Sequence, residues 1–199
     1  MENIIQLKIT LKGSKPPIWR RVLVKKDVAF DVLHHVIQIC MGWQNYHLYE
    51  FETEKYLISE HDEEDYAYKD RKKLLESMTT KLVYVLTDKK FIYIYDFGDG
   101  WQHEILIEKF LPVDKKIKYP VCIAGKMHCP PEDCGGIGGY GNMLEALKDK
   151  NHPEYKEYKN WIGGYNFDTK YFDIEEVNNQ LSFLNDYING YNRNRDFEE

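Results

Sequence analysis

The sequence predicts an α+β fold: a largely antiparallel sheet with a ββαβ, ubiquitin-like start, a central hairpin and C-terminal helices. Three observations predict it. An alternating segment and a second predicted strand precede a helical segment. Two β-rich segments flank an Asp-Gly pair, and three predicted helices follow residue 141. The length of 199 residues suits one domain at residues 1–190, followed by a frayed tail at 191–199.

The first half of the chain alternates between strand and helix patterns. Apolar and polar residues alternate along the first segment, which predicts a half-buried strand joined by a five-residue turn to the second. Apolar residues then recur at helical spacing from Leu33 to Cys40, with Asp31 suited to the first turn and Gly42 to the C-terminus. The three strands expected here are residues 4–12, 18–24 and 47–53.

The middle of the chain contains the clearest hairpin. Residues 91–96 and 101–108 are β-rich, and Asp99-Gly100 between them is a pair favoured in tight turns. Residues 74–87 are ambiguous between helix and strand. The charged runs at 60–65 and 69–73 predict a solvated connection.

Residues 112–141 are expected to form an irregular loop that carries a function. This window holds four of the seven prolines, six of the thirteen glycines and three of the four cysteines. Three helices are expected after it. The first begins near Asn142 with Glu145 in a capping box, the second ends at Gly163, and the third is capped by Asp173.

Composition and charge exclude several classes of protein. With 43% hydrophobic and 15% aromatic residues, the chain can bury a core and is not disordered. A net charge of −6 makes duplex DNA a less suitable partner. There is no signal peptide and no membrane-length apolar run, so we expect no membrane association, a cytoplasmic location and reduced cysteines.

The central hairpin carries candidate catalytic residues: Asp96, Asp99 and His103. Two carboxylates and an imidazole can ligate a divalent metal or perform acid–base chemistry, as in a metal-dependent hydrolase or nuclease. The alternative is that both aspartates bond turn amides while His103 packs beside Trp101.

The loop at 112–141 carries candidate zinc ligands: Cys122, His128, Cys129 and Cys134. Four ligands suit zinc, but only Cys129 and Cys134 have a spacing close to that of the short ligand pairs found in structural zinc sites. The alternative is that the thiols pack as small apolar groups. Residues 136–141 match G-x-G-x-x-G, which either binds phosphate at a helix start or lets chain segments approach closely.

A third set combines arginine, histidine and aromatic residues from neighbouring elements. Such a set can stack a base or hold an acidic peptide, although a buried polar network with core tryptophans is the alternative that we favour. Because adjacent strand residues point to opposite faces, only one of Arg20 and Arg21 can face any such site. The candidate binding residues are Trp19, Arg20, His34, Gln38, Trp43, His47 and Trp101.

Four motifs in order resemble the plasmid pRiA4b ORF-3-like family, whose members are also described as transposon passenger or resolvase-like proteins. The resemblance implies an α+β domain associated with mobile elements and carries no established activity. The motifs are Ile18-Trp19-Arg20-Arg21-Val22, the helix residues Leu33-His34 and Gln38 with Met41-Gly42-Trp43 and His47-Leu48, residues 95–103 (YDFGDGWQH), and Tyr119-Pro120 with residues 129–136 (CPPEDCGG).

These observations favour a non-enzymatic binding module for a protein or nucleic-acid partner. The chain is rich in aromatic residues and has no complete catalytic constellation. The alternative is the metal-dependent hydrolase or nuclease at Asp96, Asp99 and His103, and zinc or another divalent metal is the cofactor to consider.

Overall fold

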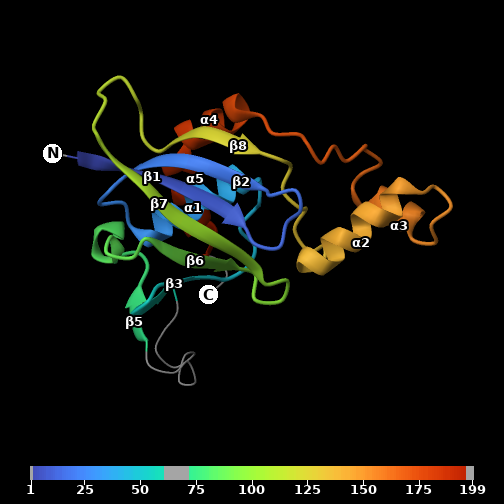
Figure 1. The fold of residues 1–199 in the computed structure, drawn as a ribbon, viewed down its shortest axis with the longest axis horizontal. Helices are drawn as coiled ribbons and strands as arrows, with labels where there is room; N and C mark the ends of the chain where they lie inside the picture. Colours follow the sequence, from blue (N-terminus) through green and yellow to red (C-terminus); the bar gives the residue numbers. More distant parts are fainter. Residues whose placement is uncertain (1, 61–71, 196–199) are drawn as a thin grey trace.

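The computed structural model describes residues 2–60 and 72–195 and has one eight-stranded sheet in the order β5-β4-β3-β6-β7-β1-β2-β8. Helices α1, α4 and α5 lie on one face of the sheet, while α2 and α3 project from one end (Figure 1). The strands are β1 (Glu2–Leu11), β2 (Trp19–Lys25), β3 (Tyr49–Glu52), β4 (Tyr56–Ser59), β5 (Lys73–Glu76), β6 (Lys90–Tyr95), β7 (Trp101–Pro112) and β8 (Val121–Lys126). The helices are α1 (Phe30–Met41), the short 3-10 helix η2 (Leu82–Val85), α2 (Gly136–Lys148), α3 (Tyr155–Trp161), α4 (Ile174–Ser182) and α5 (Leu184–Arg195).

The α+β class and both predicted hairpins are confirmed. Strand β1 pairs antiparallel with β2 and with β7, and β6 pairs antiparallel with β7. The period-two pattern buries Ile5, Leu7 and Ile9 completely against the helical layer. Strand β3 follows α1 as expected and is separated from β1 in the sheet by β6 and β7.

Helix α1 forms where its spacing predicts, and most of its side chains are buried between the sheet and α4 and α5. It ends at Gly42, whose φ of 81° lets its N–H reach the carbonyl oxygen of Gln38 at 2.8 Å. Among the helices of the described residues, none is long and apolar enough to cross a membrane.

The structure differs from the sequence-based expectation between residues 112 and 141. Strand β8 lies within this window because it pairs with the free edge of β2, a long-range contact that local pattern does not reveal. Helix α2 begins at Gly136, so Asn142 lies inside it and is not its cap. Most of the charged connection at 60–73 lies outside the described residues.

The C-terminal helices agree with the sequence in part. Asp173 caps α4 by accepting hydrogen bonds from the amides of Glu175 and Glu176. The single helix expected after it is broken at Phe183 into α4 and α5. Helix α5 continues to Arg195, so regular structure extends into the tail expected at 191–199.

Two glycines allow close backbone approach at the start of α2: Gly136, the first glycine of the G-x-G-x-x-G match, and Gly139, at one of its variable positions. A Cβ on Gly139 would lie 1.8 Å from the carbonyl oxygen of Cys134, and one on Gly136 would lie 2.3 Å from that of Asp99. A Cβ on Gly138 would meet no atom within 4 Å. The packing interpretation therefore applies to one motif position, Gly136, and within a helix, because a Cβ on Gly141 would also meet no atom within 4 Å.

We expect Gly139→Ala to destabilise the protein by about 2 kcal/mol or more, because the backbone oxygen of Cys134 must move to admit the methyl group. Gly138→Ala is the matched control, and it should stabilise the protein by about 0.5–1 kcal/mol because alanine is the better helix former. Urea unfolding midpoints measure both changes. Equal effects of the two substitutions would contradict the steric explanation.

Candidate functional site

Three chain segments meet beyond the ends of β6 and β7: residues 43–48, the hairpin turn 96–100 and residues 127–136. An aromatic group joins them. The Trp43 ring stacks on Tyr95 at a centroid distance of 5.2 Å and packs at 5.6 Å from Trp101. Its Nε1 donates a 2.9 Å hydrogen bond to the carbonyl oxygen of Pro130. Buried aromatic packing and this bond therefore fix residues 127–136 against the sheet.

Glu132 strengthens this junction with both carboxylate oxygens. The Tyr95 hydroxyl donates to Oε1, and the Gln44 amide donates to Oε2 at 2.8 Å. Burial, followed by the hydrogen bond to Glu132, raises the pKa of Tyr95 well above its usual value, so the phenol is protonated and remains the donor. The neighbouring residue Asp133 is positioned by this anchor.

Asp96 bonds turn amides, as one of the two interpretations of the sequence states, whereas Asp99 bonds an amide outside the turn. Asp96 adopts φ 55°, and its Oδ1 accepts hydrogen bonds from the amides of Gly98 at 2.9 Å and Asp99 at 3.3 Å. Asp99 Oδ2 accepts from the amide of Gly135 at 3.1 Å. The second oxygen of Asp96, Oδ2, is left facing His47.

His47 lies between two carboxylates. Its Nε2 is 3.0 Å from Asp133 Oδ1 and 3.7 Å from Asp96 Oδ2. Each residue of this trio, His47, Asp96 and Asp133, offers one ligand atom within 4.8 Å of the others. Within residues 2–60 and 72–195, it is the one group of three such side chains close enough to hold a metal ion. Asp133 was missed because no spacing in the sequence connects it to the hairpin.

His103 is fully buried and does not join this trio. It packs edge-on against Trp43, and neither ring nitrogen has a hydrogen-bond partner of good geometry. Burial lowers its pKa to about 3 and keeps the ring neutral. Trp101 beside it is also fully buried. The three predicted catalytic residues therefore do not share one solvent-facing site.

Arg20 is 3% exposed and serves the interior. Its guanidinium donates to the carbonyl oxygens of Cys40 at 2.8 Å and Lys126 at 3.0 Å, and lies 4.2 Å from the centre of the Phe172 ring. Trp19 lies on the opposite face of β2, 5.1 Å from the Arg21 guanidinium. The two arginines thus face opposite sides of the sheet, as strand geometry predicts.

His34 and Gln38 form a buried network with Tyr93. Nδ1 of His34 is 2.7 Å from the Tyr93 hydroxyl, and Gln38 Nε2 donates to the same oxygen at 2.9 Å. His34 Nε2 lies 2.6 Å from Asn45 Oδ1, and the ring stacks on Tyr49. Burial lowers the pKa of His34 well below its usual value. Of the seven predicted binding residues, five are buried, while Trp19 and His47 are partly exposed.

Among the described residues, no three of the four predicted zinc ligands lie close enough together to hold one metal ion. Cys122 contacts the thiol of Cys40, Cys129 lies 3.3 Å from an Arg20 nitrogen, and His128 stacks on Phe167. Burial raises the pKa of Cys129 to about 11 and that of Cys134 to about 12. Both thiols are therefore protonated at neutral pH, which agrees with the packing interpretation.

A groove of about 510 Å³ opens between the β1–β2 turn and the α2–α3 pair. Aliphatic and aromatic residues both line it, together with three lysines, and the aromatic residues are Tyr140, Tyr155, Tyr165 and Phe167. No aspartate or glutamate is among the described residues that line it. The aliphatic residues are Ile18, Met127, Leu144, Leu147 and Ile162, and the lysines are Lys15, Lys148 and Lys159.

Buried His103 is one of the groups that make folding sensitive to acid. His103 takes up a proton near pH 6.5 when unfolded but only near pH 3 when folded, so its contribution to stability is lost as pH falls through this window. The loss amounts to roughly 3 kcal/mol at pH 4. We expect His103→Leu to reduce this pH dependence and to change stability at pH 7 by less than about 1.5 kcal/mol.

Urea unfolding at several pH values between 4 and 7.5 tests this expectation, with His152→Gln in the α2–α3 connection as the control. An unchanged slope of stability against pH in His103→Leu would show that other groups dominate the acid sensitivity.

Comparisons with known proteins agree with this fold. Residues 3–176 match the family model described as plasmid pRiA4b ORF-3-like protein. The chain is 35% identical to uncharacterized protein y4hQ of Sinorhizobium fredii over 92% of each chain. It resembles the crystal structure of MM3350, a protein of unknown function from Methanosarcina mazei Go1, with a TM-score of 0.78 and 39% identity over 87% of this chain and 97% of that one. None of these descriptions mentions a transposon or a resolvase. The chain belongs to the plasmid pRiA4b ORF-3-like family.

Proposed function

We propose that the protein is a binding module whose groove between the β1–β2 turn and the α2–α3 pair holds a peptide segment of a partner protein. The observation that carries this proposal is the groove itself, which is lined by aliphatic and aromatic residues and by three lysines. The segment we expect combines aliphatic side chains with carboxylates.

The aliphatic part of the lining favours a peptide segment. Bases are held by stacking on aromatic rings alone, whereas here Leu144, Leu147 and Ile162 line the groove beside its aromatic residues. Aliphatic side chains fill such a surface with little loss of contact. The tyrosines of the lining, such as Tyr140, provide hydroxyl groups beside this apolar floor.

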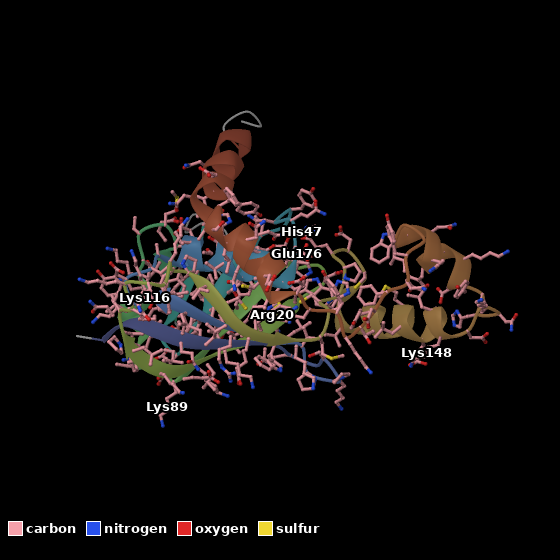
Figure 2. All side chains as sticks on the ribbon, turned by 90° about the horizontal axis from the view of Figure 1, so that it is seen from above. Arg20, His47, Lys89, Lys116, Lys148 and Glu176 are labelled. Atoms are coloured by element: carbon pink, nitrogen blue, oxygen red, sulfur yellow. The ribbon has the colours of Figure 1, made fainter. Side chains whose placement is uncertain are left out.

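Charge favours an acidic partner. Lys15, Lys148 and Lys159 line the groove of a chain whose net charge is −6. Lys148 pairs with Glu145 at 2.6 Å, so the positive charge that no carboxylate of the described residues pairs comes from Lys15 and Lys159. Figure 2 shows Lys148 on the projecting helical pair, far from Lys89 and Lys116 on the body of the molecule. A local positive site on a negative protein steers acidic segments toward it.

Exposed aromatic residues extend the surface next to the groove. Trp161 is 46% exposed and Tyr165 is 78% exposed, and both line an adjoining cavity of about 480 Å³. Tryptophan and tyrosine are enriched where proteins contact one another. We therefore place the partner over both hollows.

The other predictions from the sequence receive less support. No specific observation favours a hydrolase or nuclease at Asp96, Asp99 and His103, since His103 is buried and Asp99 bonds Gly135. We retain the cytoplasm and a mobile-element context as proposals, the first because all four cysteines are free thiols.

Selection from a display library of short random peptides tests the proposal, with oligouridylate and oligothymidylate as nucleic-acid probes. Selected peptides should pair Asp or Glu with Leu, Ile or Phe, and should bind more weakly in high salt. The double variant Lys15→Glu/Lys148→Glu should weaken their binding about tenfold or more. Calorimetry measures the affinities.

The matched control is Lys89→Glu/Lys116→Glu, which makes the same charge change away from the groove. Equal weakening by the two double variants would contradict a groove site. If the oligonucleotides bind and no peptides are enriched, the partner is a single-stranded nucleic acid and the peptide proposal is wrong. If neither oligonucleotides nor peptides bind, the proposal of a binding groove is wrong.

A further inference from the structure

We propose that His47, Asp96 and Asp133 bind a divalent first-row transition-metal cation, such as Mn²⁺ or Zn²⁺, with open positions for water. This site is separate from the groove and does not depend on the proposed binding function. Its ligands come from the segment after α1, the β6–β7 turn and the segment before α2.

The donor set fits this class of cation. One imidazole nitrogen and two carboxylate oxygens suit manganese, iron or zinc, whereas magnesium and calcium prefer oxygen alone. The donor atoms lie within 4.8 Å of one another, so small side-chain shifts would bring them to one ion. His47 and Asp133 are partly exposed, which leaves one side of the ion to solvent.

The most buried ligand has an oxygen that no hydrogen bond satisfies. Asp96 is 7% exposed, and its Oδ1 is occupied by the amides of Gly98 and Asp99. Among the described residues no donor lies within hydrogen-bond distance of Oδ2, which is aimed at His47 Nε2 at 3.7 Å. The Asp96 side chain is 11% exposed, so this oxygen is open to a cation that enters from solvent.

Charge at the junction also points to a cation. Within the described part of the chain, the ion-pair partner of both Asp96 and Asp133 is His47, and neither carboxylate contacts a lysine or arginine. The single Nε2–H of His47 can donate a hydrogen bond to Asp133, but it cannot also donate one to Asp96. A cation bound at the Nε2 lone pair would neutralise both carboxylates at once.

The ligands are held in place by neighbouring bonds. The Tyr95–Glu132 and Gln44–Glu132 hydrogen bonds fix the chain on either side of the trio. The turn amides fix Asp96, and Gly135 is tied to Asp99. Ligands positioned in advance bind a metal without the cost of ordering a flexible loop.

Calorimetry of the full, chelator-treated chain with Mn²⁺ and Zn²⁺, and electron paramagnetic resonance with Mn²⁺, test this site. We expect one ion per chain and a rise in the thermal unfolding midpoint on binding. His47→Gln and Asp133→Asn should each weaken binding about tenfold or more. The controls His152→Gln and Asp27→Asn remove the same groups elsewhere and should leave binding unchanged.

The variants are compared only after circular dichroism has shown that each is folded. If His47→Gln or Asp133→Asn does not fold, Asp96→Asn takes its place as the variant of the third, buried ligand. Absence of binding by the native chain to both ions would overturn the proposal. So would binding that persists in His47→Gln and Asp133→Asn, or that is lost to the same extent in the controls.

Discussion

The attachment of residues 127–136 to the end of the sheet is the constraint on which the rest of this region depends. Trp43 holds it through the carbonyl of Pro130, and Tyr95 holds it through the carboxylate of Glu132. Each bond involves a buried or half-buried polar group that would lose its partner if the segment lifted. The path of the chain between β8 and α2, and therefore the position of Asp133, follows from these two contacts.

The sequence pattern predicts those parts of the sheet that depend on interactions between residues close together in the chain. The alternation around Leu7 and the turn at Asp99-Gly100 specify the two hairpins because period two and turn chemistry act over a few residues. The strand at Val121–Lys126 and the early start of α2 at Gly136 depend on partners far along the chain, namely β2 and the backbone of Asp99. A glycine-rich segment has low helix propensity, so tertiary packing decides its structure.

The candidate site could be predicted in the same partial way. His47 and Asp96 are singled out in the sequence by residue type, but each with different expected neighbours. Asp133 belongs to the motif at residues 129–136, but as a single carboxylate in a predicted loop it gives no signal of metal binding before the fold is known. His103 shows the opposite error, because an imidazole with catalytic character in a strand becomes a neutral core residue once Trp43 covers it.

The two proposed sites share one segment, since Met127 lines the groove and Asp133 belongs to the trio. Ligands at two sites influence each other only when both bias an element that has two arrangements. Here the bonds to Pro130 and Glu132 lie between the sites and hold the segment in one arrangement. Binding of a cation at one end and of a peptide at the other should therefore be nearly independent, because the junction that creates both sites also isolates them.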